Sequence, residues 1–239
     1  RMLMVIDPEQ AETARAIFDK WDLDFMPIGR VTDTQRLVLL KDGGVACDIP
    51  LAPLVDDAPE YDRPYRPNEL QPVLTSASLI CDFSVKDVLI KLMSSADLAS
   101  RRWIYEQYDH MVGTDTLVRP GSDSAVIRIK NSKKALCLTT NCNSGYCLLN
   151  PSAGASIAVA ESTRNIIASG GKPLAITNCL NFGNPENREI MWQFSKSIEG
   201  ISKACKNFNT PVVSGNVSLY NESTKDSIKP TPVISMVGI

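Results

Sequence analysis

Hydrophobic residues recur along the chain with two different periods, which predict a mixture of strands and helices. Short runs that are wholly apolar, or that alternate apolar and polar positions, are typical of β-strands. They occur at residues 2–6, 26–31, 36–40, 45–49, 125–129, 135–140, 174–177, 211–219 and 232–239. Longer stretches with apolar residues three and four positions apart are typical of helices. They occur at residues 8–21, 85–93, 96–108, 154–169 and 185–208 and predict, with the strands, an α+β fold.

Residue types at the ends of the helical stretches support these limits. Asp7 precedes Pro8, and Asn184 precedes Pro185, which is the order expected of an N-cap followed by the first helical position. Gly170 and the glycine after it are suited to end the helix at residues 154–169.

Proline marks three regions along the chain. Residues 1–50 read as strand, helix and three further strands, which resembles the end of an α+β domain but is too small to enclose a core. Residues 51–84 are rich in proline, which blocks helices and sheets, and we expect an extended linker there. Residues 85–239 form a second α+β region. The chain begins and ends inside strand-like runs, and we therefore expect it to be a segment of a longer protein.

The amino-acid composition excludes several classes of protein. The 239 residues are 44% hydrophobic and 22% charged, which is typical of a globular protein and not of a disordered chain. The 25 basic and 27 acidic residues leave no basic excess, so nucleic acid is not expected as a partner. No apolar run approaches the roughly 20 residues that span a membrane. The seven cysteines include no C-x-x-C pair, which favours free thiols in a reducing compartment over a zinc site.

Three places could carry chemistry. Glu161 and Asn165 lie four positions apart, so their oxygens share one helix face and would suit a magnesium ion. The same stretch could instead be a tightly packed helix with a polar edge. Asp123 precedes a strand and is either a cation ligand or a turn residue.

The other two places follow apolar strands. Gly215 permits a close approach of the backbone, and Asn216 and Ser218 would project on one face if the strand continues. These groups could bind phosphate or metal, or could simply end a strand. Asn178 belongs to a polar stretch, residues 177–186, which we interpret as a loop between a strand and the long helix.

Two common catalytic signals are missing from the sequence. His110 is the single histidine, and no nucleophile is paired with it by pattern. The glycine-rich loops of P-loop enzymes and kinases are absent, so any ATP site must be of another type.

Several long motifs, in order, resemble the phosphoribosylformylglycinamidine synthase family in its small, multi-subunit form. The main motifs are residues 172–186, 191–194, 210–222 and 230–234, and shorter matches lie at residues 1–3, 18–23, 55–59, 107–110 and 158–165. The resemblance implies an aminoimidazole ribonucleotide synthetase-like N-terminal domain at residues 85–239, preceded at residues 1–50 by the tail of a C-terminal domain of the same superfamily.

The family implies a reaction and its partners. ATP phosphorylates the amide oxygen of formylglycinamide ribonucleotide, Mg²⁺ offsets the phosphate charge, and ammonia displaces the phosphate to give formylglycinamidine ribonucleotide. The ammonia would come from a glutaminase subunit, and a small accessory subunit and the remainder of the parent chain would complete a cytoplasmic enzyme of purine synthesis.

The resemblance also implies roles for individual residues. Asn178 and Gly215 match ATP-contacting positions, Asn216 matches a magnesium ligand, and Ser218 matches a substrate contact. A possible auxiliary nucleotide–magnesium site corresponds to Asp123, Glu161 and Asn165. The family's catalytic histidines and main magnesium carboxylates lie in its first half, so no catalytic residue is assigned here and the segment alone is expected to be inactive.

Three positions depart from the family pattern. The family usually carries Asp where this chain has Asn141, Asn150 and Asn178. Each change removes a charge and keeps an acceptor oxygen, so we expect weaker nucleotide binding than in a relative with Asp at position 178. The lost acids also fit an alternative, in which the segment is a non-catalytic module for domain pairing.

Overall fold

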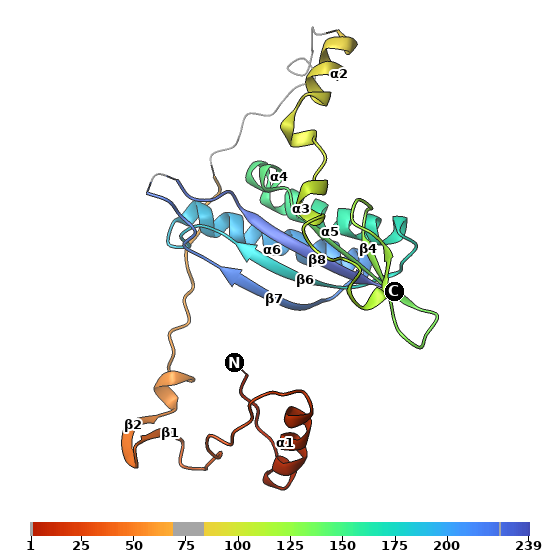
Figure 1. Ribbon diagram of the computed structural model, residues 1–239. Coiled ribbons are helices and arrows are strands. Elements are labelled where there is room, and N and C mark those ends of the chain that lie inside the picture. Colours follow the sequence, from red (N-terminus) through yellow and green to blue (C-terminus); the bar gives the residue numbers. More distant parts are fainter. Residues whose placement is uncertain (1, 69–83, 225) are drawn as a thin grey trace. The chain divides into compact units, whose positions relative to one another are not determined.

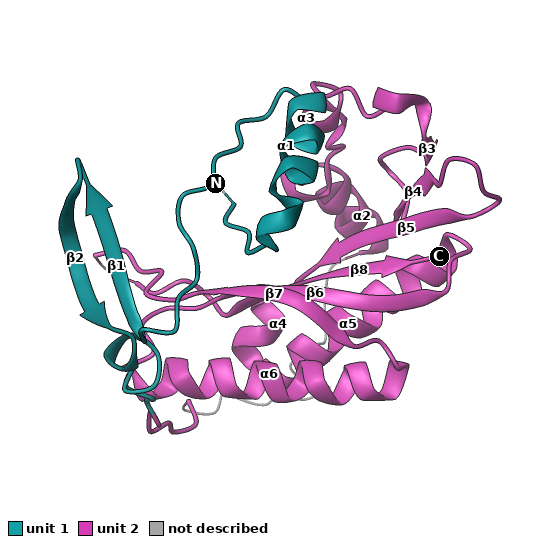
Figure 2. Cartoon of the chain, turned by 90° about the horizontal axis from the view of Figure 1, so that it is seen from below, with its two compact units in different colours: residues 1–61 teal, residues 62–239 magenta. Residues whose placement is uncertain are grey.

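The computed structural model describes residues 2–68, 84–224 and 226–239, and the chain divides into two compact units, Arg1–Tyr61 and Asp62–Ile239 (Figures 1 and 2). Residues 69–83 of the predicted linker, including Cys81, lie outside the described residues. Each unit is described by itself.

The first unit contains one helix and one hairpin. Its elements are the 3₁₀ turn η1 (Pro8–Gln10), α1 (Ala11–Lys20), β1 (Arg36–Lys41), β2 (Gly44–Pro50) and η2 (Ala52–Leu54). The predicted N-cap is confirmed, because the Asp7 carboxylate accepts a hydrogen bond from Glu9 N at 3.1 Å. The strands predicted at residues 2–6 and 26–31 are wrong. A strand needs a neighbour with which to share its backbone hydrogen bonds, and within residues 2–61 the two strands of the hairpin pair only with each other.

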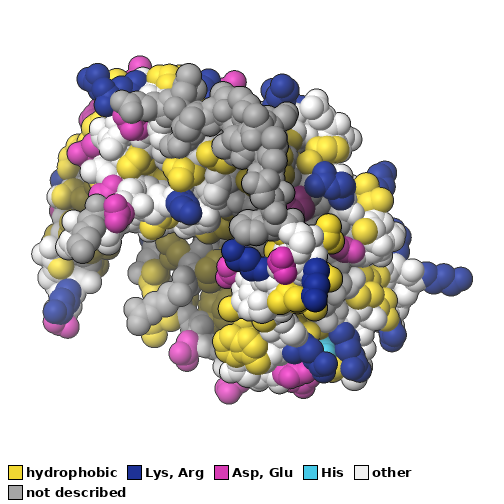
Figure 3. Space-filling view, turned by 90° about the horizontal axis from the view of Figure 1, so that it is seen from above, with side chains coloured by type: hydrophobic (Ala, Val, Ile, Leu, Met, Phe, Trp, Pro, Cys, Tyr) yellow, Lys and Arg dark blue, Asp and Glu magenta, His cyan; other side chains and the backbone are white. Residues whose placement is uncertain are grey.

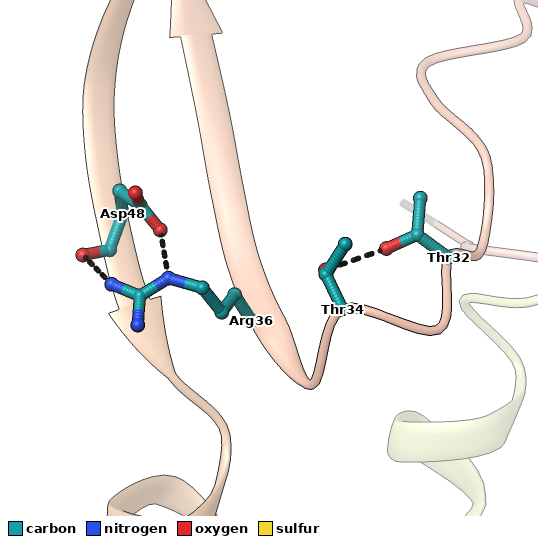
Figure 4. Close-up of polar contacts among 4 residues, drawn as sticks. All are labelled: Thr32, Thr34, Arg36 and Asp48. Carbon is teal, nitrogen blue, oxygen red and sulfur yellow. Dashed lines mark hydrogen bonds and ion pairs between the residues drawn. The ribbon is translucent and has the colours of Figure 1, made fainter.

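The hairpin forms where the sequence predicts it. Asp42 and Gly43 both have positive φ, 52° and 80°, as a tight two-residue turn requires. On the hairpin surface, Arg36 Nε lies 2.6 Å from Asp48 Oδ1, and its Nη2 donates to the Asp48 carbonyl at 3.1 Å (Figure 4). Thr32 and Thr34 share a hydroxyl hydrogen bond of 2.9 Å just before β1. Because both members of the ion pair are exposed, it contributes little stability.

The second unit is built on a six-stranded sheet in the order β3-β4-β5-β8-β6-β7. The strands are β3 (Thr116–Val118), β4 (Ala125–Arg128), β5 (Ala135–Asn141), β6 (Pro173–Asn181), β7 (Val212–Ser218) and β8 (Thr231–Gly238). Neighbours are antiparallel except for β6 and β7, which are parallel. A parallel pair needs a crossover connection, and the long helix α6 (Arg188–Phe208) supplies it.

One face of this sheet is covered by helices α4 (Ser144–Leu149), α5 (Pro151–Ala168) and α6 (Figure 2). Strand β8 alternates strictly: Pro232, Ile234 and Met236 are buried, whereas the residues between them are only half-buried. The core therefore lies between the sheet and α5 with α6. The elements that precede the sheet in sequence are α2 (Val85–Met93), η4 (Ala96–Leu98), α3 (Arg102–Tyr105) and η5 (Val112–Thr114).

The predicted α+β class is confirmed, with local corrections. The helix predicted at residues 96–108 is broken, because the Arg101 guanidinium donates hydrogen bonds to the carbonyls of residues 96, 97 and 99, and Ala99 is extended. The long helix begins at Arg188 and not at Pro185. Its N-cap is Asn187, whose side chain accepts from Glu189 N at 2.9 Å. Strand β3 and helix α4 were not predicted, because each is too short to show a period.

Charge is distributed as the composition predicts. On the face drawn in Figure 3, basic and acidic side chains are interspersed among hydrophobic ones. Within the described ranges, no helix is both long and apolar enough to cross a membrane.

Candidate functional site

Asn178 and Gly215 are paired across the parallel strands β6 and β7. A Cβ atom placed on Gly215 would lie 2.1 Å from Asn178 Oδ1, so the Asn178 side chain occupies the space that Gly215 leaves open. The prediction that residues 177–186 form a loop is wrong for Asn178 and Asn181. Both lie inside β6, because hydrogen bonding to β7 on one side and to β8 on the other extends the strand to Asn181.

A cavity of about 560 Å³ borders Asn178 on the helix side of the sheet. It lies between β6, the C-terminal half of α6 and the turn that leads into β7. Its volume is within the range of small-molecule sites. The lining residues are Asn178, Leu180, Ile198, Ile201, Ser202, Cys205, Lys206, Asn209, Thr210, Pro211 and Val212.

The cavity wall contains one perturbed thiol. Burial raises the pKa of Cys205 above its ordinary value, and the neighbouring Thr210 hydroxyl opposes this in part. The helix ends beside it at Asn209, which has the left-handed conformation (φ 54°) and closes α6 onto the Cys205 carbonyl. Because burial raises its pKa, Cys205 stays protonated at neutral pH and offers no nucleophile to the cavity.

Asn216 and Ser218 lie on the opposite face of β7 from Gly215, since side chains alternate along a strand. The prediction that the strand continues and places both on one face is confirmed, because β7 runs to Ser218. Strand β7 is at the edge of the six-stranded sheet, with β6 as its one neighbour in the described sheet. A ligand that lies along this edge can therefore contact Gly215 from one face and Asn216 from the other.

Asn221 is a site residue that no pattern along the sequence singles out. Its amide Nδ2 donates to the carbonyls of Ser218 at 2.8 Å and Phe182 at 3.0 Å, and its Oδ1 accepts from the Ser218 hydroxyl at 3.2 Å. One side chain thus joins the ends of β6 and β7 and orients Ser218. The motif at residues 210–222 contains Asn221, but no spacing rule shows what its amide would contact.

The segments that follow β6 and β7 are also bound to each other. Glu222 Oε1 accepts from the backbone N of Asn184 at 2.8 Å, and the Tyr220 hydroxyl lies 3.3 Å from Glu186 Oε1. Gly183 admits Ser227 so closely that a Cβ would lie 1.8 Å from its Oγ. These contacts hold the ends of the two strands in one arrangement.

The three residues of the predicted auxiliary site lie in one neighbourhood, but they do not converge as a carboxylate cluster. Asn165 donates to Asn141 Oδ1 at 3.2 Å and to Thr139 Oγ1 at 3.3 Å, and Thr139 in turn donates to the backbone carbonyl of Asp123 at 3.1 Å. The charge of the Glu161 carboxylate acts on the Cys142 thiol and opposes the lowering of its pKa. Among the described residues, no three His, Cys, Asp or Glu side chains are placed to hold a metal ion.

The other Asn residues at family Asp positions have structural partners. Asn150 accepts from Ala153 N at 3.0 Å and caps α5, which Asp would do equally well. Asn141 donates to Ser162 Oγ at 2.9 Å, a bond that an ionised carboxylate could keep only if the hydroxyl turned to donate.

Two family models match the chain. Residues 121–239 match "AIR synthase related protein, N-terminal domain", and residues 1–42 match "AIR synthase related protein, C-terminal domain". The chain is 51% identical over 244 residues to phosphoribosylformylglycinamidine synthase subunit PurL of Zymomonas mobilis, covering 100% of this chain and 33% of that one. Identity to the same subunit of Caldanaerobacter subterraneus is 47%, with 100% and 33% covered.

Solved structures agree with these similarities. Thermotoga maritima PurL complexed with ATP has a TM-score of 0.73 and 30% identity, covering 98% of this chain and 36% of that one. The same protein complexed with FGAR has a TM-score of 0.70 and 32% identity, with 97% and 35% covered. The structure of PurLQS from Thermotoga maritima has a TM-score of 0.73 and 32% identity, with 97% and 36% covered. The chain spans about a third of the length of the curated relatives that it matches.

Proposed function

Because this chain belongs to the AIR synthase related family and matches phosphoribosylformylglycinamidine synthase subunit PurL over its whole length, we propose that it serves the ATP-dependent amidation of formylglycinamide ribonucleotide. The reaction is that of a carbon–nitrogen ligase: ATP activates the amide oxygen as a phosphate ester, and ammonia replaces the phosphate. The observation that carries the proposal is the Asn178–Gly215 pair at the edge of the sheet, beside the 560 Å³ cavity.

Each residue at this edge has a proposed task. Asn178 and Gly215 contact ATP: the missing side chain of Gly215 leaves room for the Asn178 side chain, and Asn178 offers a neutral amide. Ser218, oriented by Asn221, contacts the ribonucleotide substrate. The proposal assigns no general acid or base to this chain.

Asn216 is the proposed magnesium ligand. It is exposed on β7 and offers one amide oxygen, which fits Mg²⁺ because this ion usually takes few protein ligands and keeps phosphate and water oxygens for the rest. When bound, Mg²⁺ would offset the charge of the transferred phosphate. Asp123, Glu161 and Asn165 are proposed as an auxiliary nucleotide–magnesium site, and the amide and hydroxyl network around Asn165 gives that proposal the weaker donor set.

The remaining proposals concern context. We assign residues 1–50 to the tail of a C-terminal domain, 51–84 to a linker and 85–239 to an N-terminal domain. Within the described part of the proposed linker, Arg66 is held against the start of α6: its backbone N donates to the Arg188 carbonyl at 3.1 Å and its side chain lies 3.0 Å from Glu189. The proposed partners are a glutaminase subunit that supplies ammonia and a small accessory subunit, in the cytoplasm.

Calorimetric titration of MgATP into the 239-residue chain tests the proposal. Gly215→Ala drives Asn178 Oδ1 from its place, and we expect at least about tenfold weaker binding. Asn178→Asp should tighten binding, because a carboxylate accepts stronger hydrogen bonds than an amide. Lys203→Ala, exposed on α6 and outside the cavity, is the matched control. Unchanged affinity in both site variants would reject the ATP assignment.

A second function is supported by the face of the six-stranded sheet that lies opposite helices α4, α5 and α6. Leu138 is 40% exposed there, and the neighbouring Val233 and Val237 are half-buried, so this face could pair with another domain without catalysis. Sedimentation of the chain over a range of concentrations separates the two functions. Self-association without MgATP binding would favour the interaction module.

A further inference from the structure

Asn181 is the last residue of β6 and lies on the same face of the sheet as Asn216 and Ser218. The parallel register pairs Asn181 with Ser218, and Cys179 with Asn216. Paired residues of adjacent strands point to the same side of a sheet, and the strands are about 4.8 Å apart. The Asn181 side chain therefore borders the two positions to which the proposed function gives the magnesium ion and the ribonucleotide substrate.

The amide of Asn181 is fixed in one orientation. Its Nδ2 donates to the backbone carbonyls of Cys179 at 3.1 Å and Thr231 at 3.3 Å, and it lies 3.4 Å from Cys179 Sγ. A carbonyl oxygen only accepts hydrogen bonds, so the nitrogen of the amide, and not its oxygen, must face these two carbonyls. Turning the amide over would bring its oxygen against both of them.

The amide oxygen of Asn181 is left for another partner. Oδ1 accepts no hydrogen bond from any of the described residues, whereas Nδ2 has the contacts given above. The neighbouring amide of Asn221 differs, because both its nitrogen and its oxygen are bonded within the protein. Asn181 is half-buried, so a ligand on this face can reach it. It presents a fixed acceptor beside Ser218.

We propose that Asn181 is a further substrate-binding residue, whose Oδ1 accepts a hydrogen bond from an N–H or O–H group of the ribonucleotide. The inference rests on the proposed function, in which Ser218 contacts the same molecule. Ionised phosphate oxygens only accept hydrogen bonds, so they are not partners for an amide oxygen. Asn181 therefore selects the amide or ribose part of the substrate, and it does not bind the triphosphate of ATP.

The same side chain also has a structural role. The bond from Nδ2 to the Thr231 carbonyl ties the end of β6 to β8. Because this bond holds the amide before a ligand arrives, little conformational freedom is lost when Oδ1 accepts its partner. Removal of the Asn181 side chain loses both roles at once, so the test must separate a loss of substrate binding from a general loss of order at this end of the sheet.

Calorimetric titration of formylglycinamide ribonucleotide into the 239-residue chain, with MgATP titrated in parallel, separates the two roles. In Asn181→Ala we expect about fivefold weaker binding of the ribonucleotide, which corresponds to one lost hydrogen bond, and MgATP affinity within about twofold of the parent. Asn181→Val should show the same losses with a side chain that suits a strand. Cys179→Ala is the matched control, because it removes the 3.4 Å sulfur contact and leaves Oδ1 in place, and it should bind both ligands as the parent does.

Ribose 5-phosphate, titrated in the same way, identifies the donor. If the Asn181 variants weaken its binding as much as that of the ribonucleotide, the donor is a ribose hydroxyl. If they leave it unchanged, the donor is the amide N–H, and both results support the inference. Unchanged ribonucleotide binding in both variants, or an equal loss for MgATP, would overturn the inference alone. A parent chain that does not bind the ribonucleotide would reject the Ser218 assignment of the proposed function, and the inference with it.

Discussion

Gly200 on α6 is a point of close backbone contact with α5, and its replacement by Ala measures how rigid the helix layer is. A Cβ at this position would lie 2.1 Å from the Ser152 carbonyl oxygen and less than 3 Å from two further backbone atoms of Ser152. Ordinary contact begins at 3.4 Å. The first turn of α5 must therefore move away by about 1 Å, because no side chain is available to yield.

The expected cost follows from competing effects. Ala is favoured over Gly inside a helix by about 1 kcal/mol. Overpacking costs about 1–3 kcal/mol or more, and the movement also stretches the 2.9 Å hydrogen bond from Ser156 Oγ to the Gly200 carbonyl, worth about 1 kcal/mol. The net expectation is a loss of about 2 kcal/mol in the free energy of unfolding, or about 4–8 °C in Tm.

The assay is unfolding by urea, followed by the fluorescence of Trp192 on α6. Trp21 and Trp103 are replaced by Phe, so that Trp192 is the one tryptophan left in the sequence. Gly215→Ala is the matched control, since its Cβ also meets an atom at 2.1 Å, but that atom is the side-chain oxygen of Asn178. The Asn178 side chain can rotate, and the one backbone atom within reach, the Asn178 carbonyl oxygen, would lie 2.9 Å away. This variant therefore needs a smaller backbone shift and should lose less stability than Gly200→Ala. If Gly200→Ala proves as stable as the parent, the argument from close backbone contact is refuted.

Two further predictions concern Asn221 and Cys205. Asn221→Ala leaves the Phe182 and Ser218 carbonyls without their amide donor, so we expect urea unfolding to show a loss of about 1–2 kcal/mol in the free energy of unfolding. The exposed Asn207→Ala is the control and should show no change. A loss below about 0.5 kcal/mol in Asn221→Ala would contradict the role of the amide. The pKa of Cys205 is raised in the folded chain, so its contribution to stability is complete below the ordinary thiol pKa of 9.0 and is lost as the pH rises through the folded value. The free energy of unfolding should therefore fall more steeply above pH 9 in the parent than in Cys205→Ala, and equal slopes would show that Cys205 does not titrate in this way.

Local patterns predicted much of the second unit. The helices at residues 85–93 and 154–169 and the strands at 125–129, 135–140 and 232–239 formed where the periods indicated. The helix at residues 154–169 and the three strands face the core of the second unit. The helix at residues 85–93 buries no residue, and its local signals include the Ser84 N-cap, whose hydroxyl accepts from Asp87 N at 3.2 Å. The turn at Asp42 and Gly43 also needs only local backbone preferences.

The predictions that were wrong share a cause: the secondary structure of these segments depends on hydrogen-bond partners outside the local pattern. The apolar runs at residues 2–6 and 26–31 resemble strands, yet no neighbouring strand in the first unit takes up their hydrogen bonds. Asn178, expected in a loop, became part of β6 because β7 and β8 lie on either side of it. The helix at residues 96–108 was broken by hydrogen bonds from the Arg101 side chain.

The candidate site shows the same division. The motifs around Asn178 and Gly215 could be recognised along the chain, and the alternation of a strand already placed Asn216 and Ser218 on one face. Their relation to Gly215 and Asn178 and the edge position of β7 depend on strand order and parallel register. Residue types and short periods are properties of neighbours in sequence, whereas register and contact arise from folding segments far apart onto one core.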